Sequence, residues 1–327
     1  MKTWSPLKEN DIACVIAPSY VLPVKERGVE FIIRANKLTP HIYPNTNVPG
    51  NHSAYDEQGL RLANTDEIRA MHFLDALNNP VCKVVWASPG GYGTIRLIKH
   101  IRNAPEPEVV KPFMGFSDIT LLHLFIQQKW GWPSIHYGMP GTLGLNSTLI
   151  SDDAKKDIGD ILFGSVMTAS FSLHQLSNYK NTDISGITSG GNILTFSRSF
   201  GTEIQPDLVG KILVFEEVGE NKRKIDGMLQ QLQLLPDFDK MSAIIFGDLT
   251  GAEDEKKEGK EPFARILNDF ALNSGVPVFR LDSKDSIGHG KETNKALPMG
   301  TNAKISCNPE CKMVVETGMS NIQNEDL

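Results

Sequence analysis

A serine in a short polar segment is the first residue whose surroundings suggest chemistry. The segment Gly115-Phe116-Ser117-Asp118-Ile119-Thr120 joins the apolar run 112–116 to an apolar helical pattern that begins near Asp118. A serine at a strand-to-helix turn has the geometry of a nucleophile elbow, where the helix N-terminus favours developing negative charge. Ile119 stands where G-x-S-x-G has its second glycine, and Ser117 can also be read as a helix N-cap. Ser117 is therefore a candidate nucleophile with a purely structural alternative.

A serine nucleophile needs a base and a group that orients the base. His289 lies between two glycines, which let the backbone place the ring at the edge of an open site. Glu216 and Glu217 end the apolar run 212–215, and a carboxylate at a strand end can face a crevice. Neighbouring strand residues point to opposite faces, so only one of the two enters a given site. The pattern alone does not say which.

Other catalytic signatures are incomplete. Arg96 replaces the third glycine of a G-x-G-x-x-G motif, and Asp285 replaces the first glycine of a P-loop. There is no H-E-x-x-H, and the eight histidines are scattered, so we expect no metal and no cofactor. Two more histidines lie in apolar elements. We expect His123 to be a core residue and His136 to line a pocket.

These residues are carried by strand-like runs that alternate with helical patterns, which is typical of βαβ units and a mostly parallel sheet. In the first half the expected strands are 12–17, 84–87, 112–116 and 134–137. Helices are expected over 94–102 and from near Asp118. In the second half the expected strands are 212–215, 243–246 and 276–279, with an amphipathic helix around 225–232.

The length of 327 residues, at roughly 150 per domain, predicts about two domains. The stretch from about Gly141 to Asp183 is irregular and rich in Ser, Asn and Thr. We therefore expect a Rossmann-like, mostly parallel N-terminal domain over 1–145, a linker region over 146–183, and a smaller C-terminal α/β domain over 184–327.

The composition indicates a globular, soluble protein. Lys and Arg total 33 against 39 Asp and Glu, a net charge of −6 that argues against a nucleic-acid partner. No run approaches 18 apolar residues, and Met1 to Pro6 lack the features of a signal peptide, so we expect no membrane partner and a cytoplasmic location. Cys14 and Cys82 are expected to be buried thiols, and Cys307 and Cys311 lack the partners of a zinc site.

Together, these motifs resemble a known family. Eight short blocks occur in the order seen in the LD-carboxypeptidase family of serine peptidases, from about residue 11 to 306: Ala17-Pro18-Ser19, Gly90-Gly91-Tyr92-Gly93, Gly115-Phe116-Ser117-Asp118-Ile119-Thr120, Gly190-Gly191-Asn192, Gly201-Thr202, Phe215-Glu216-Glu217-Val218-Gly219-Glu220, Asp226-Gly227-Met228-Leu229 and Gly288-His289. The resemblance implies a Ser-His-Glu triad of Ser117, His289 and Glu216. It also implies an active site in the cleft between the two domains, and a homodimer.

The resemblance further implies an oxyanion hole of backbone amides, carried onto Asp118 and Gly91, and substrate contacts from Gly90 and Tyr92. Two departures stand out. Family members usually have an arginine directly before the Gly-Gly-Tyr-Gly turn, where this chain has Pro89, and their acid pair is commonly Glu-Asp rather than Glu-Glu. Arg96 and Arg198 are considered as replacements that bind the substrate carboxylate. The sequence selects neither.

Three functions follow as hypotheses. The first is a metal-independent serine carboxypeptidase that removes the terminal D-alanine from a muropeptide tetrapeptide during cell-wall recycling. The second keeps the chemistry but, like the microcin C immunity peptidases of the same family, cleaves the amide of an aminoacyl-nucleotide. Such an enzyme needs an aromatic surface for the base, for which Trp86, Tyr92 and Trp132 are candidates. The third is a non-catalytic protein that binds a peptide or sugar in the cleft.

Overall fold

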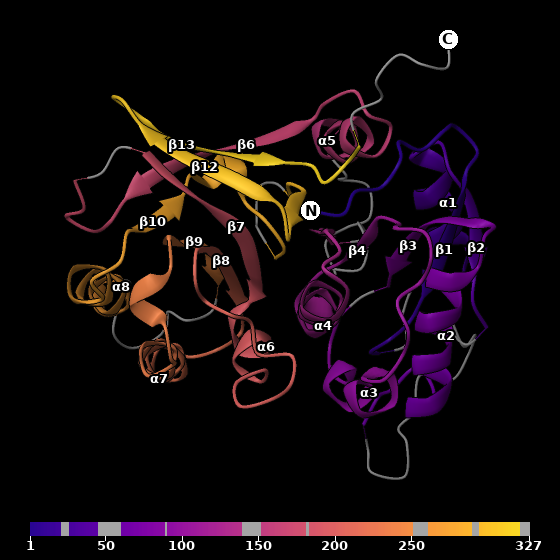
Figure 1. Cartoon of the computed structure of the whole chain (residues 1–327), viewed down its shortest axis with the longest axis horizontal. Helices are drawn as coiled ribbons and strands as arrows, with labels where there is room; N and C mark the ends of the chain where they lie inside the picture. The colour runs from indigo at the N-terminus through magenta and orange to yellow at the C-terminus, as the bar shows by residue number, and fades with distance from the viewer. Residues whose placement is uncertain are drawn as a thin grey trace.

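Two sheets of different architecture lie side by side in the computed structural model (Figure 1). The structure describes residues 1–20, 26–44, 60–88, 90–138, 152–180, 183–250, 261–289 and 294–320. One unit is an open six-stranded sheet and the other is a closed barrel.

The open sheet has the strand order β11-β5-β4-β3-β1-β2. Its strands are β1 (Ile12–Ile16), β2 (Thr39–Ile42), β3 (Cys82–Ala87), β4 (Phe113–Gly115), β5 (Ser134–His136) and β11 (Leu297–Met299). All pairings are parallel except that of β11 with β5. The helices of this unit are α1 (Glu26–Ala35), α2 (Asp66–Asn78), α3 (Thr94–Ile101) and α4 (Thr120–Trp130), the last preceded by a 3₁₀ turn at Ser117–Ile119.

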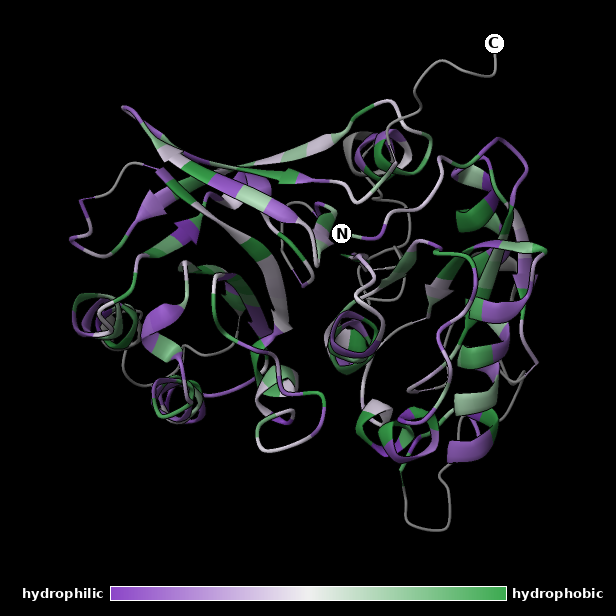
Figure 2. Cartoon of the chain, in the orientation of Figure 1, coloured by the Kyte–Doolittle hydropathy of each residue, from purple (hydrophilic) through white to green (hydrophobic). Residues whose placement is uncertain are grey.

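Helices cover both faces of this sheet, and strand β1 shows why its sequence is apolar throughout. Ala13 and Val15 belong to the same buried cluster as Val29 of α1, whereas Cys14 and Ile16 belong to the cluster that contains α2, α3 and α4. A parallel strand buried on both faces requires a continuous apolar run rather than an alternating one. Figure 2 shows hydrophobic and hydrophilic residues on α3, where Leu97, Ile98 and Ile101 are buried at the spacing expected for a helix with one buried face.

The second unit is a closed barrel with the order β10-β6-β13-β12-β7-β8-β9. Its strands are β6 (Thr168–Gln175), β7 (Asp183–Asn192), β8 (Lys211–Val218), β9 (Ala243–Thr250), β10 (Val278–Leu281), β12 (Asn302–Cys307) and β13 (Cys311–Glu316). Strands β7 to β10 are parallel and alternate along the chain with α6 (Ile193–Ser197), α7 (Lys222–Gln233) and α8 (Glu261–Asn273). Strands β6, β12 and β13 close the barrel through antiparallel pairings.

The expected fold class is confirmed, since a parallel-rich sheet is followed by a second α/β unit. The expected linker differs from what the structure shows. Within 146–183, the described part contains helix α5 (Asp152–Leu162) and strand β6, and β6 pairs with β10 and β13 of the barrel. Polar residues alternate with buried ones along β6, so the segment reads as irregular although it is half-buried strand.

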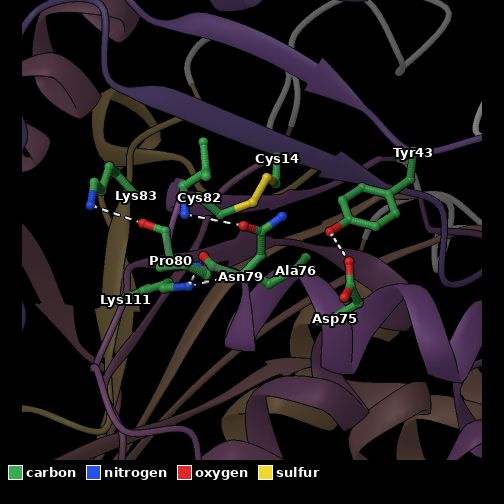
Figure 3. Close-up of a disulfide and its surroundings, with 10 residues drawn as sticks. Cys14, Tyr43, Asp75, Ala76, Asn79, Pro80, Cys82, Lys83 and Lys111 are labelled. Carbon is green, nitrogen blue, oxygen red and sulfur yellow. Dashed lines mark hydrogen bonds between the residues drawn. A yellow bond between two sulfur atoms is a disulfide. The ribbon is translucent and has the colours of Figure 1, made fainter.

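The cysteines differ from the expected free thiols. Cys14 of β1 and Cys82 of β3 form a buried disulfide with their Cα atoms 5.6 Å apart (Figure 3). Cys307 and Cys311 form a second disulfide, and they are register partners in the β12–β13 hairpin. Cys14 and Cys82 are 68 residues apart in the sequence. Their proximity follows from the parallel pairing of β1 with β3, which is a tertiary feature.

Candidate active site

The turn between β4 and α4 holds Ser117 in a conformation that L-residues rarely adopt. Ser117 has φ 60°, whereas Phe116 before it is extended. For a residue other than glycine, the left-handed region costs about 1–2 kcal/mol. Such strain is typical of functional turns, because the surrounding structure must maintain it. The Ser117 side chain is half-buried, and it stands at the start of the 3₁₀ turn that leads into helix α4.

A glycine turn packs directly against this serine. A Cβ at Gly90 would lie 2.5 Å from Cβ and 2.7 Å from Oγ of Ser117, and 2.9 Å from the backbone nitrogen of Asp118. Only a residue without a side chain allows this approach. The next residue, Gly91, has φ 112°, and a Cβ there would meet the ring of Tyr20. The backbone of the turn after β3 therefore lies directly beside the backbone amide of Asp118.

Asp118 fixes three loops around Ser117. Its buried carboxylate accepts hydrogen bonds through Oδ2 from the hydroxyl of Ser19, at 2.7 Å, and from the backbone N–H of Thr94, at 2.8 Å. The Thr94 hydroxyl in turn donates to the backbone oxygen of Asp118 at 2.6 Å. The loop after β1, the start of α3 and the Ser117 turn are thus held together by one residue.

His289 and Glu216 form a hydrogen-bonded pair. Nδ1 of His289 lies 2.6 Å from Oε2 of Glu216, which is fully buried near the C-terminal end of β8. The register between β8 and β9 shifts at this residue, an irregularity of the kind found beside active sites. Gly288 has φ 60°, and a Cβ there would lie 2.8 Å from the Glu216 side chain. The glycine before the histidine is therefore required for the pair to form.

The two members of this pair stabilise each other's charged forms. Burial opposes the charge on His289, but the charge of Glu216 and the hydrogen bond to it outweigh burial, so the pKa of His289 lies above its ordinary value. Burial also opposes ionisation of Glu216, and the partner His289 more than compensates, so the pKa of Glu216 lies below its ordinary value. Burial, followed by the charge of Glu216, raises the pKa of Glu217.

Glu217 has a structural role, as only one acid of the pair faces His289. Its carboxylate accepts hydrogen bonds from the backbone N–H groups of Leu194, at 3.1 Å, and Val218, at 2.8 Å. The structure therefore shows which of the two neighbouring glutamates faces the histidine, a choice that the sequence pattern left open. Glu216 contacts the histidine, and Glu217 anchors the start of α6.

Two more histidines lie close together in the open-sheet unit, with their ring centres 6.1 Å apart, and one of them is near Glu216. Nε2 of His136 is 3.8 Å from Oε1 of Glu216, and burial lowers the pKa of His136 to about 4. In the described part of the chain, neither ring nitrogen of His136 has a hydrogen-bond partner. His123 is a satisfied core residue, as expected, because its nitrogens lie 2.8 Å from the Ser134 hydroxyl and 2.9 Å from the Gly115 oxygen.

Residues of the two units meet at the Ser117 turn. The ring of Phe116 lies 4.8 Å from the imidazole of His289, centre to centre. The Thr120 hydroxyl donates to the Ser117 oxygen at 2.7 Å and accepts from the Asn192 N–H at 3.0 Å. Asn192 is the register partner of Glu216. Thr120 therefore connects the serine turn to the strand beside Glu216.

The other residues named from the sequence have different surroundings. Arg96 donates to both oxygens of Asp66, at 2.8 and 3.0 Å, so its guanidinium is already bound to a carboxylate of the protein. Arg198 reaches the site, with Nη1 3.6 Å from Oδ1 of Asp118 and its guanidinium 5.7 Å from the centre of the Tyr92 ring. Trp86 and Trp132 are buried. Pro89 lies outside the described residues.

The connecting roles of four residues were not predicted from the sequence: Thr120, Asn192, Ser19 and Thr94. Thr120, Asn192 and Ser19 occur in the blocks that carry the family resemblance, and that was the available signal. Among the described residues, no three His, Cys, Asp or Glu side chains are placed to hold a metal ion. Of the described helices, none has the length and apolar character needed to cross a bilayer.

Comparison with known proteins identifies the family. The pattern of the LD-carboxypeptidase N-terminal domain matches residues 13–137, and that of the C-terminal domain matches residues 185–305. A protein of Rickettsia prowazekii that is named as a carboxypeptidase is 33% identical over 262 residues, which cover 78% of each chain. The chain belongs to the LD-carboxypeptidase family.

Two further proteins are similar to this LD-carboxypeptidase family member. The murein tetrapeptide carboxypeptidase of Pseudomonas aeruginosa is 29% identical over 257 residues, covering 76% of this chain and 80% of that one. The solved structure of MccF in complex with glutamyl sulfamoyl guanosine has a TM-score of 0.76 at 17% identity, covering 98% of this chain and all of that one. The likeness to MccF shows a common fold. As a member of the LD-carboxypeptidase family, the protein is a serine-type carboxypeptidase and therefore a hydrolase.

Proposed function

We propose that this enzyme releases the terminal D-alanine from muropeptide tetrapeptides by hydrolysing an L-D amide bond. Ser117 is the nucleophile, His289 the general base, and Glu216 the acid that orients the imidazole. The observation that carries this assignment is the 2.6 Å contact between His289 and the buried carboxylate of Glu216, beside a strained serine turn. The name of the Pseudomonas aeruginosa relative supports the substrate.

The reaction follows from the protonation states of the pair. The hydrogen bond to Glu216 occupies Nδ1 of His289, so Nε2 is the nitrogen available to take the Ser117 proton. Ser117 Oγ attacks the carbonyl carbon, and the imidazolium that forms is stabilised by the Glu216 carboxylate. The same proton then passes to the leaving amine as the C–N bond breaks. Water then hydrolyses the acyl-enzyme. His289 takes a proton from the attacking water and returns a proton to Ser117 Oγ as the ester bond breaks.

The oxyanion is proposed to bind the backbone amides of Asp118 and Gly91. Support comes from the close approach of Gly90 to Ser117 Oγ and to the Asp118 nitrogen, which brings the two backbone segments together. Preorganised N–H donors of this kind contribute about 3 kcal/mol each to transition-state stabilisation. Gly90 and Tyr92 are the proposed substrate contacts. We further propose that the site lies in a cleft between the two units, which is supported by the origin of Ser117 in the open-sheet unit and of Glu216 in the barrel.

An aminoacyl-nucleotide substrate remains the alternative, given the MccF complex with glutamyl sulfamoyl guanosine. Base stacking requires an accessible aromatic face. Trp86 and Trp132 are buried, and Arg198 lies over the Tyr92 ring. These surroundings favour the peptide substrate.

The test is incubation of the purified enzyme with muropeptide tetrapeptide and, separately, with a glutamyl sulfamoyl nucleoside, followed by mass spectrometry. We expect loss of one alanine from the tetrapeptide. With Ser117→Ala, we expect kcat to fall by at least about a thousandfold, because the nucleophile is removed. Turnover of the nucleoside amide alone would refute the proposed substrate. Cleavage retained by the variant would refute the nucleophile.

The homodimer and the cytoplasmic location expected from the sequence remain predictions. A molar mass in solution of twice 36.1 kDa would support the dimer. The two disulfides weigh against the cytoplasm, because such bonds are rare in a reducing compartment.

A further inference from the structure

We propose that Arg198 binds the free terminal carboxylate of the substrate and thereby selects for peptides with an unblocked C-terminus. The inference rests on the proposed function, since it presumes that Ser117 attacks the last peptide bond. It concerns an arginine of the barrel unit that lies just after α6.

Arg198 extends from its own unit to the residue that follows the candidate nucleophile. Its Nη1 is 3.6 Å from Oδ1 of Asp118, the residue that directly follows Ser117. Its guanidinium carbon lies 5.7 Å from the ring centre of Tyr92, in the glycine turn that packs against Ser117. The positive charge therefore lies beside side chains from both segments that flank the serine.

The guanidinium has donors left for a ligand. A separation of 3.6 Å from Asp118 is an ion pair but too long for a hydrogen bond. Within the described ranges, Oδ1 of Asp118 accepts no hydrogen bond, and Arg198 makes none through its side chain. Arginine carries five N–H donors in a planar fork that matches a carboxylate. One third of the Arg198 side chain is exposed, so a ligand can reach it.

Nearby arginines are already engaged. Arg69 is buried, and it donates to a carboxylate oxygen of Asp66, at 2.5 Å, and to the Gly93 backbone oxygen, at 3.2 Å. Arg96 donates to the same Asp66. Both arginines stabilise the start of α2 and the glycine turn. Among the described contacts of these three arginines, the guanidinium of Arg198 is the one that makes no hydrogen bond.

The contact of Arg198 with the residue that follows Ser117 fits an enzyme that removes one residue. In such a substrate the terminal carboxylate is one residue beyond the scissile carbonyl, and a residue spans at most about 3.6 Å. The cation must therefore lie close to the nucleophile. Arg198 meets this requirement because it pairs with the residue adjacent to Ser117.

The experiment compares two substrates and three enzymes. Tetrapeptide with a free C-terminal carboxylate and the same peptide with a C-terminal amide are hydrolysed by the wild type, Arg198→Ala and Arg198→Lys. For the free acid, we expect Arg198→Ala to raise KM about 10- to 100-fold, the effect of losing a charge-assisted pair, with a smaller rise for Arg198→Lys. For the amide, we expect little change. Arg280→Ala, an exposed arginine on β10, is the matched control and should behave as wild type.

Binding separates this inference from the proposed function. Calorimetric titration of Ser117→Ala and Ser117→Ala/Arg198→Ala measures affinity for the acid and the amide without turnover. An acid preference that disappears with Arg198 supports the inference, even if the wild type does not cleave the tetrapeptide. Equal KM values in wild type and Arg198→Ala, or an acid preference that survives the substitution, would overturn it. If Arg198→Ala does not fold, as judged by circular dichroism, Arg198→Lys and Arg198→Gln take its place.

Discussion

At the scale of single residues, this site combines strain with charge compensation. Ser117 is held at φ 60°, at a cost of about 1–2 kcal/mol, by a turn that Asp118 anchors through three hydrogen bonds. Glu216 is a fully buried carboxylate that stays ionised because His289 donates to it. Removing either partner leaves a buried polar group unpaired, which is costly. The pair is therefore stable only as a unit.

Replacing Glu216 tests this pairing through the pH profile. His289 must be neutral to accept a proton, and its pKa lies above the ordinary value of about 6.5, so wild-type kcat/KM should rise with a midpoint above that value. In Glu216→Gln the opposing effect of burial remains while the carboxylate charge is lost. We expect the midpoint to move to lower pH and the plateau to fall by about 10³- to 10⁴-fold. Initial rates across pH 5 to 9 measure both.

Glu217→Gln is the matched control for this experiment. Glu217 also raises the pKa of His289, but only through its charge and less than Glu216 does. We expect a smaller shift of the midpoint and a plateau near that of the wild type. An unchanged midpoint in Glu216→Gln would contradict the pairing.

At the scale of elements, the sequence predicted the strands that contain an uninterrupted apolar run. The expected runs 12–17 and 84–87 are β1 and β3, and 212–215 lies within β8. The residues of these runs are continuously apolar, as expected for parallel strands buried on both faces, and this is a strong local signal. The missed strands are β2, β6, β7, β11, β12 and β13. β7 contains three glycines, and β12 alternates exposed and buried residues, so their pairing depends on partners distant in sequence.

The candidate site was also only partly predictable from the sequence. Local patterns singled out Ser117, His289 and the pair Glu216-Glu217, and only the family resemblance selected Glu216. The contacts that join them could not be predicted. Thr120 and Asn192 meet across 72 residues, and Arg198 and Asp118 across a similar separation. No local pattern encodes which loop of one unit faces which loop of the other.

The turn after β3 offers a test at this scale. In Gly90→Ala the new Cβ would lie 2.7 Å from Ser117 Oγ, so the glycine turn or the serine must move. We expect kcat to fall by about tenfold or more, since a small misplacement of reacting groups has effects of this size. In Gly227→Ala on α7, the Cβ meets nothing within 4 Å. That control should keep full activity and gain about 0.5–1 kcal/mol in the free energy of unfolding.

At the scale of the whole molecule, the site exists only where the two units are in contact. Helix α4 contacts both β7 and α6 of the barrel, and Figure 1 shows it at the boundary between the units. The buried cluster on this side contains residues of both units, including Phe125 of α4 and Phe196 of α6. Activity should therefore depend on how closely β7 approaches α4.

Gly191 at the end of β7 tests this dependence. It has φ 113°, and a Cβ there would lie 2.5 Å from Thr120 Oγ1. Gly191→Ala should push the units apart and lower kcat at least about tenfold. Gly210→Ala is matched, because φ is also positive, at 67°, but a Cβ meets nothing within 4 Å. Both variants should lose about 1 kcal/mol or more of stability. Equal activities would mean that the approach of β7 does not position the site.

Strand β11 has a consequence for how this protein can be divided. It follows His289 in the sequence, yet it pairs antiparallel with β5 at the edge of the open sheet. The chain therefore passes between the units three times. A gene fragment that ends after β5 would encode a sheet whose last strand has an unpaired edge, and such edges recruit strands from other molecules. Neither half can be transplanted as an independent module, so a nucleophile-bearing fragment expressed alone would tend to self-associate through β5.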